Sequence, residues 1–267
     1  MTPNLRASLY ELVGSFAVVL ATSGAVVANG FPALAGQAGF GRIGIALAAG
    51  CVYAAALAFT VRVSGGFLNP AITVTLWVFQ RLDSQRAGMF IVAQTLGALL
   101  AGLALRGLFF VNENALLESR LGTPHLNLRA FDAGDLERPV IFQGIAIEGL
   151  LTFLLVFAIF ALVFDSRFRR AAGETAHRLA YLWLGMLVTA VTLLAFDYTG
   201  AAMNPARWLG LVIWESTVAG LQSRHPWADH GPYWIGPILG SLLAGILYTY
   251  LLLPVDERKG PPKDGMP

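Results

Sequence analysis

Two stretches decide the fold of this chain: Ser64-Gly65-Gly66-Phe67-Leu68-Asn69-Pro70-Ala71 and Thr199-Gly200-Ala201-Ala202-Met203-Asn204-Pro205-Ala206. In each, a run of small residues precedes the tripeptide Asn-Pro-Ala, and a short apolar segment follows it. An average composition predicts about 0.05 copies of this tripeptide in a chain of this length. Two copies in matching contexts, about half the chain apart, therefore indicate an internal repeat.

The composition is that of a polytopic membrane protein. Of the 267 residues, 56% are hydrophobic and 13% are charged, and the mean hydropathy is +0.65; soluble domains average about 25% charged residues. The net charge of +2 gives no reason to expect a nucleic-acid partner. Cys51 is the single cysteine, so no disulfide can form within the chain. The first apolar run follows only Arg6, and we expect a retained span rather than a cleaved signal peptide.

We predict an all-α integral membrane protein with six spanning helices, because six apolar runs are long enough to cross about 30 Å of hydrocarbon. The predicted spans are Ser8–Val27, Ile43–Val61, Gly88–Val111, Val140–Phe164, Leu179–Phe196 and Tyr233–Leu253. Two further apolar segments, Asn69–Gln80 and Asn204–Ile213, are shorter. About 10–12 helical residues cover about 15–18 Å, half a bilayer. We predict that these segments are re-entrant half-helices.

The whole chain, residues 1–267, is predicted to form one domain made of two repeats, at about residues 5–111 and 140–253, with a flexible tail at 254–267. Glu11 opens the first span and Glu148 lies in the fourth, so each half reads as a Glu-bearing span, a second span, a half-helix and a third span. Three crossings per half is an odd number, so the second half must be inverted relative to the first. Inverted-repeat folds place their sites at the midplane, on discontinuous helices.

Loop charge predicts the orientation. Arginines cluster after the second and fourth spans, at Arg62, Arg81, Arg86, Arg167, Arg169, Arg170 and Arg178. The loop Asn112–Pro139, which contains His125, mixes basic and acidic residues. By the positive-inside rule, the two Arg-rich loops and both termini are cytoplasmic, and we expect a multi-pass protein of the plasma (inner) membrane. The long loop is interpreted as a folded cover over the outer vestibule, with a gating role as the alternative.

Half-helices that enter from opposite faces would meet N-terminus to N-terminus near the bilayer centre. Each N-terminus carries about half a positive charge and unsatisfied N–H groups. Asn is a favoured N-cap and Pro is tolerated just inside a helix start, so Asn69-Pro70-Ala71 and Asn204-Pro205-Ala206 suit these two positions. We expect the capping Asn residues to leave their amide NH2 groups free to face a pore. Two such donors beside two positive helix ends repel cations, including hydronium.

Backbone carbonyls are expected to line the approach to each Asn, because non-helical backbone at membrane depth is tolerated only inside protein or beside a wet cavity. The residues expected to present them are Gly65, Gly66, Phe67, Gly200 and Ala202. A pore with such a carbonyl ladder, two central donors and otherwise apolar walls suits small neutral molecules.

Three charged residues are predicted to lie at membrane depth, where a charge is costly unless it is paired or wet. Arg207 is interpreted as a donor and cation barrier at a narrow point, with an ion pair that anchors the half-helix as the alternative. Glu11 and Glu148 are interpreted as structural supports, because their symmetric placement fits carboxylates that accept hydrogen bonds from loop N–H groups. A proton relay is the alternative for these two residues.

The chain resembles the aquaporin (major intrinsic protein) family over about Leu5 to Leu253. The motifs that carry the resemblance are the two Asn-Pro-Ala boxes, Arg207 after the second, Asp197-Tyr198-Thr199-Gly200 before it, Ala93-Gln94 with Gly97-Ala98, and the two Glu-bearing spans. The resemblance implies a right-handed bundle of six helices plus two half-helices, and a homotetramer with one pore per subunit. Water and small neutral solutes would be the permeants, and the lipid bilayer the surrounding partner.

The family's selectivity filter, counted from each Asn, falls on Ala49, Thr192, Ala201 and Arg207. Strict water channels of the family have an aromatic residue at the first position and His at the second, and this chain has neither. Its small, weakly polar set implies a wider aperture and is most similar to plant channels that pass metalloid hydroxides such as silicic or boric acid.

Other positions give conflicting indications of the solute. Trp208 stands where glycerol channels of the family have Asp, and Phe67 stands where the family usually has His. Tyr233-Trp234 is more similar to water-channel members. The solute is therefore left open among water, glycerol, urea and metalloid hydroxides, including arsenous acid.

The expected function is a passive, proton-excluding channel for water and small uncharged solutes. A secondary transporter is the alternative, because discontinuous helices at a midplane also build transporter sites; no half-helix residue supplies an acid for ion coupling. An enzyme ranks third, since no Ser–His–acid, Cys–His or paired-carboxylate constellation falls at a shared depth. We expect no cofactor and no metal site, because His177, His225 and His230 lack metal-ligand spacing with acidic partners.

Overall fold

The computed structural model describes residues 1–34, 38–110, 113–131, 137–168, 170–171, 173, 179–222 and 225–255. Within them all regular structure is helical, and six helices are long and apolar enough to cross a membrane. The predicted fold class is thereby confirmed. Most of the predicted tail, together with His177, Arg169 and Arg178, lies outside the described residues.

The six long helices occupy the six predicted spans. They are α1 (Pro3–Leu34), α2 (Gly41–Thr60), α4 (Ser84–Leu108), α6 (Glu137–Ile159), α8 (Ala180–Thr199) and α10 (His230–Ile246). The prediction is least accurate for α1, which begins five residues before Ser8 and continues past Val27. An apolar run marks the hydrocarbon core, whereas a helix ends where its backbone groups find other partners, so the two boundaries need not coincide.

Two of these helices end in an irregular turn that the sequence did not predict. The helix α6 continues as η2 (Phe160–Phe164), and α10 continues as η4 (Leu247–Leu252); both are π-helical. The carboxylate of Asp165 accepts a hydrogen bond from the Tyr248 hydroxyl at 2.8 Å and pairs with Arg167. Arg167 also donates to the Leu252 carbonyl. Its bond to Asp165 lowers the pKa of that carboxyl to about 2, so a charged cluster joins the two helix ends.

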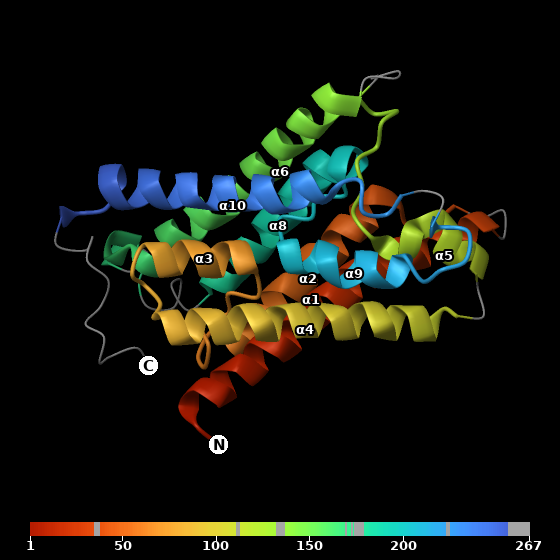
Figure 1. Ribbon diagram of the computed structural model, residues 1–267. Coiled ribbons are helices and arrows are strands. Elements are labelled where there is room, and N and C mark those ends of the chain that lie inside the picture. Colours follow the sequence, from red (N-terminus) through yellow and green to blue (C-terminus); the bar gives the residue numbers. More distant parts are fainter. Residues whose placement is uncertain are drawn as a thin grey trace.

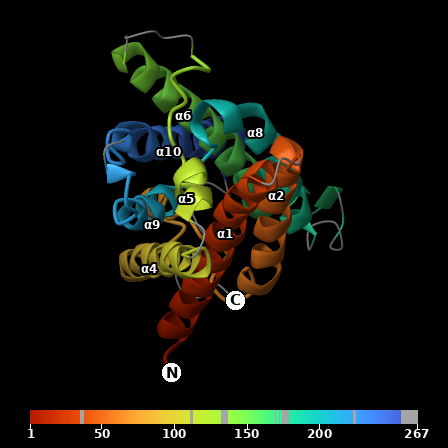
Figure 2. The same cartoon turned by 90° about the vertical axis from the view of Figure 1, so that its right-hand side faces the viewer.

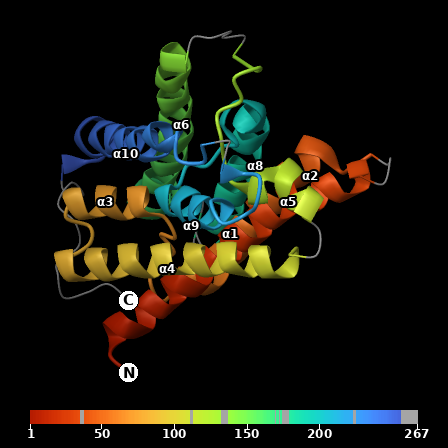
Figure 3. The same cartoon turned by 45° about the vertical axis from the view of Figure 1, so that its right-hand side comes forward.

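The two predicted half-helices are α3 (Pro70–Val78) and α9 (Pro205–Glu215). They follow one another in line between α4 and α10 (Figure 1), and the same arrangement is visible after a 45° turn (Figure 3). The half-helix α3 packs on α10, and α9 packs on α4. Each half-helix therefore also packs on a spanning helix of the other repeat, so the two repeats are interlocked.

The long helices pair in the way that a two-fold repeat requires. The helix α1 packs on α4 and, equivalently, α6 packs on α10, while α2 packs on α8 between the repeats. Figure 2 shows α1 beside α2, with α4 on the other side of α1. Small residues allow these close approaches. At the crossing of α6 and α10, for instance, a Cβ on Gly240 would overlap the backbone oxygen of Gly149.

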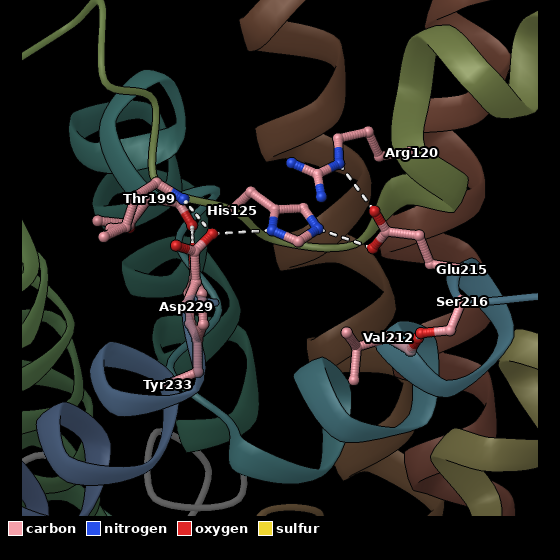
Figure 4. A network of polar contacts seen from close by, with 9 residues as sticks. Arg120, His125, Thr199, Val212, Glu215, Ser216, Asp229 and Tyr233 are labelled. Atoms are coloured by element: carbon pink, nitrogen blue, oxygen red, sulfur yellow. Dashed lines mark hydrogen bonds and ion pairs between the residues drawn. The ribbon is translucent and has the colours of Figure 1, made fainter. Parts of the chain in front are cut away.

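The loop between the repeats is folded where the structure describes it. It contains α5 (Glu113–Ser119) and η1 (Arg120–Gly122), which pack on α1. His125 then bridges two carboxylates (Figure 4): its Nε2 lies 2.7 Å from Glu215 Oε2, and its Nδ1 lies 2.8 Å from Asp229 Oδ2. Arg120 donates to the second oxygen of Glu215 at 2.8 Å. The loop is thus clamped to the end of α9 and the start of α10.

This clamp favours the protonated form of His125. Burial by itself lowers the pKa of the imidazole, but its hydrogen bonds to Asp229 and Glu215 and the charge of Glu215 raise the pKa above its usual range overall, against the charge of Arg120. In the protonated ring both nitrogens donate, which matches two carboxylate acceptors.

We expect Gly240→Ala to destabilise the fold, because the added methyl group would overlap Gly149 at the crossing of α6 and α10. Overpacking of this kind costs about 1–3 kcal/mol. The thermal unfolding midpoint of the detergent-solubilised protein measures it. Gly88→Ala on α4 is the matched control: nothing lies within 4 Å of its added Cβ, so that variant should unfold at or above the wild-type temperature. Equal midpoints in the two variants would contradict the close crossing.

We also expect the protein to lose stability as the pH rises. A His pKa raised in the folded state contributes stability that is complete below about pH 6.5, its unfolded value, and is lost as the pH passes through the raised pKa. The unfolding midpoint of the wild type should therefore fall from pH 6 to pH 9, and His125→Gln should flatten this dependence. His230→Gln should keep it, because His230 is exposed and its ring is bonded to the Trp227 carbonyl rather than to Glu215 or Asp229. A fall of the same size in His125→Gln would refute the assignment.

Candidate conduction pathway

Each half-helix begins at the predicted Asn. The Oδ1 of Asn69 accepts a hydrogen bond from the Ala71 N–H at 2.9 Å. The Oδ1 of Asn204 accepts from the N–H groups of Ala206 and Arg207 at 3.0 and 3.3 Å. Both Asn residues have an extended backbone and precede Pro, which lacks an N–H that would need a partner. Local chemistry alone therefore starts both helices at these points.

The amide NH2 groups of the two Asn residues are not free, contrary to the expectation from the sequence. The Nδ2 of Asn69 donates to the Met203 carbonyl at 2.7 Å, and the Nδ2 of Asn204 donates to the Leu68 carbonyl at 2.9 Å. Each Asn thus bonds to the lead-in of the other half-helix, which ties the two N-termini together. An amide NH2 has two hydrogens, so one donor per Asn remains.

A buried carboxylate holds each lead-in. Glu11 on α1 accepts hydrogen bonds from the backbone N–H groups of Phe67 and Leu68, at 3.0 and 2.7 Å, and from the side chains of Ser64 and Gln94. Glu148 on α6 has the same pattern in the other repeat. It accepts from the N–H groups of Ala202 and Met203, at 3.0 and 2.6 Å, and from the Thr199 hydroxyl at 2.6 Å.

The backbone just before each Asn is strained in the same way. Leu68 and Met203 both have a φ of +53°, in the left-handed region that non-glycine residues rarely adopt. This conformation turns their N–H groups toward the carboxylate while their carbonyls accept from the opposite Asn. The carboxylates and the Asn amides together satisfy the strained backbone, which offsets its conformational cost.

A narrow cavity of about 40 Å³ lies beside the two Asn residues. That volume holds roughly three water molecules. Its lining consists of Val18, Thr22, Ala49, Tyr53, Asn69, Leu155, Val188, Thr192, Ala202, Met203, Asn204 and Arg207. Three of the four predicted filter residues, Ala49, Thr192 and Arg207, are therefore on one cavity with both Asn residues.

Arg207 is buried and is held by backbone rather than by a carboxylate. One of its guanidinium nitrogens donates to the Ala201 carbonyl at 2.7 Å, and its Nε has no hydrogen-bond partner in the described structure. No described carboxylate lies within ion-pair distance of it. The Thr192 hydroxyl on the same cavity is also unpartnered. Two residues of the cavity wall thus carry a positive charge and buried polar atoms with unused bonding capacity.

The fourth predicted filter residue lies differently. The side chain of Ala201 is fully buried and belongs to neither cavity lining, so its contact with Arg207 is through its carbonyl. Gly200 is also absent from the linings and packs against Pro124 of the covering loop.

A second, wider cavity of about 340 Å³ opens where α2 ends. Gly65, Gly66 and Phe67 of the first lead-in contribute to its lining, whereas Ala202 of the second contributes to the narrow cavity. Four of the five residues expected in the carbonyl ladder are thus on the two cavities. Glu11 and Glu148 line neither.

Tyr53 on α2 lines both cavities and was not singled out from the sequence. Its spacing was a usable signal, because Tyr53 follows Ala49 by four residues and so lies one turn along the same helix face. Leu155 and Val188 are similar cases: apolar residues on spans, which nothing in the sequence distinguishes from lipid-facing ones.

Comparisons with known proteins agree with this architecture. The family model for major intrinsic proteins matches residues 1–248. Aquaporin TIP4-4 of Zea mays is 36% identical over 263 residues, which are 97% of this chain and 92% of that protein. Aquaporin-4 of Mus musculus is 35% identical over 199 residues, 74% of this chain and 52% of that protein.

Among solved structures, the aquaglyceroporin from Plasmodium falciparum has the same fold, with a TM-score of 0.76 at 19% identity, covering 93% of this chain and 96% of that one. The sequence matches, the shared fold and the paired half-helices lead to one conclusion: the chain belongs to the aquaporin (major intrinsic protein) family of membrane channels.

Proposed function

We propose that this multi-pass membrane channel is passive, conducts water and small uncharged solutes, and excludes protons. The observation that carries the proposal is the set of polar atoms beside the narrow cavity whose bonding capacity the described protein leaves unused: the Thr192 hydroxyl, the Arg207 Nε and one amide hydrogen of each Asn. An unsatisfied buried polar group costs about 1–3 kcal/mol. A polar group that forms a hydrogen bond to a passing molecule avoids that cost. Small solutes with hydrogen-bonding groups can form such bonds.

Proton exclusion follows from the charges at the same place. The two half-helix N-termini contribute partial positive charge, and Arg207 adds a full one that has no described carboxylate within ion-pair distance. A water molecule that accepts hydrogen bonds from both Asn residues must point its hydrogens away from the centre, which interrupts a relay of protons along the file. Cations and hydronium are repelled by the same field.

We infer that Ala49, Thr192 and Arg207 determine which solutes pass, with Ala201 acting through its carbonyl. The side chains of Ala49 and Thr192 are small, which supports an aperture wider than that of a water-only channel. Glycerol, urea and metalloid hydroxides are then candidate solutes beside water. The relatives named above are called aquaporins and the structural neighbour an aquaglyceroporin, so both solute classes are included in the test.

We further propose that Glu11 and Glu148 act as supports rather than as a proton relay. Every bond described for the two carboxylates goes to a lead-in or to Gln94, and neither residue lines the narrow or the wide cavity.

The wider cavity is proposed to face the cytoplasm, together with both termini, because Arg62 lines it and Arg-rich segments follow α2 and α6. A plasma-membrane location and a homotetramer with one pore per subunit complete the proposal.

Purified protein in liposomes tests the function by stopped-flow light scattering. We expect water permeability well above that of empty liposomes and solute flux that rises linearly with the gradient, without dependence on sodium or proton gradients. A pH-sensitive dye inside the vesicles should report no acidification when a proton gradient is applied. Saturable, ion-dependent flux would instead favour the transporter alternative, and comparing water, glycerol, urea and boric acid identifies the solute class.

For selectivity, we expect Ala49→Phe combined with Thr192→His to narrow the filter. Flux of glycerol, urea and boric acid should fall by about 10-fold relative to water, the scale on which a tight apolar site discriminates size. Cys51→Phe is the control, because it adds the same bulk to α2 at an exposed position outside both cavity linings. An equal loss of water and solute flux in the double variant, or no loss of either, would rule out these filter positions.

A further inference from the structure

Tyr53 is the one described residue that lines both the narrow and the wide cavity. On one side of it lie the two Asn residues with Thr192 and Arg207, and on the other lies the space of about 340 Å³ that opens beyond Phe67. The side chain is only 6% exposed, so it is enclosed by protein rather than by solvent. Tyr53 is therefore the residue at which the walls of the two cavities meet.

The Tyr53 hydroxyl is a buried polar group with no hydrogen-bond partner in the described structure. Buried tyrosine hydroxyls usually have a partner, because an unmet bond is costly. Its neighbours in the two linings include the apolar side chains Leu57, Leu155, Val188 and Phe67. No described residue supplies that partner, so the hydroxyl has bonding capacity left for a molecule in the pathway.

We propose that Tyr53 is a second selectivity point of the channel, at which the ring limits the width and the hydroxyl binds each passing water or solute. This inference rests on the function proposed above and adds a residue on the opposite side of the Asn pair from the filter. A tyrosine hydroxyl can donate one hydrogen bond and accept another. It therefore suits water and the hydroxyl groups of small neutral solutes equally well.

Phe67 adds to the argument for a polar side chain at this point. Its ring lines the wide cavity beside Tyr53 and packs on Phe90, with ring centroids 6.0 Å apart. A phenyl ring has no hydrogen bond to give, so a molecule that leaves the Asn residues toward the wide cavity would meet apolar side chains if Tyr53 were apolar as well. One hydroxyl shortens the interval over which the molecule has no side-chain partner.

Two substitutions separate the two roles in the liposome assay. Tyr53→Phe keeps the ring and removes the hydroxyl, and we expect water flux to fall by about 3- to 10-fold, the effect of losing one net hydrogen bond at a barrier. Tyr53→Leu removes the ring, and we expect the ratio of glycerol flux to water flux to rise by about 10-fold. Tyr181→Phe, the same change at a residue that lines the wide cavity alone, should leave both quantities at wild-type values.

The unfolding midpoint of each variant shows whether a fall in flux is due only to a loss of folded protein. Tyr53→Phe removes an unpartnered hydroxyl and should not lower that midpoint. Wild-type water flux in Tyr53→Phe, alongside a conducting wild-type protein, would overturn this inference and leave the channel proposal standing. A wild-type protein that conducts neither water nor solutes would overturn both.

Discussion

The structure depends on one constraint: backbone that is not helical must still find hydrogen-bond partners at the centre of a membrane. The two lead-ins, residues 64–68 and 199–203, meet this constraint in the same way. Glu11 and Glu148 accept their N–H groups, and each Asn donates to a carbonyl of the opposite lead-in. Because these bonds are made inside the protein, two helices can begin at the midplane. Without that, a chain of this composition would have only continuous spans and no polar point along its axis.

The repeat supplies the scaffold, and residues that depart from the repeat make the two cavities differ. Arg207 follows its Asn by three residues, and the equivalent residue after Asn69 is the buried Ile72. The same comparison pairs Ala202 with Phe67, the residues two positions before each Asn. The narrow cavity thus has the buried Arg207 beside small side chains such as Ala202, whereas Phe67 lines the wide cavity. The carboxylates and Asn residues that hold the two lead-ins are symmetric, whereas the residues that line the two cavities are not. Charge and width can therefore differ between the cavities.

The chemistry of the Asn residues also shows how one group serves two purposes. The side-chain oxygen starts a helix, one amide hydrogen joins the two half-helices, and the other hydrogen is left for the pathway. A free NH2, as the sequence suggested, would be a stronger donor site but would leave the carbonyls of Leu68 and Met203 without these bonds. In the observed arrangement, one hydrogen of each amide stabilises the fold, and the bond that it makes fixes the orientation of the remaining donor.

The amino-acid sequence by itself determined the six spans, the two half-helices and the Asn caps, because apolar length, helix-start chemistry and repeat spacing are local properties. Ala49, Thr192 and Arg207 were selected through a family resemblance rather than through physics, and the structure has all three on one cavity. Tertiary structure alone decided that Tyr53 joins two cavities, that Ala201 contributes a carbonyl, and that His125 clamps the loop to Glu215 and Asp229. The clamp joins residues 90 and 104 apart in the chain, and the place of Tyr53 depends on which face of α2 turns inward. Ala201 and Arg207 are only six residues apart, but their bond needs a lead-in whose next two N–H groups are held by Glu148 on another helix.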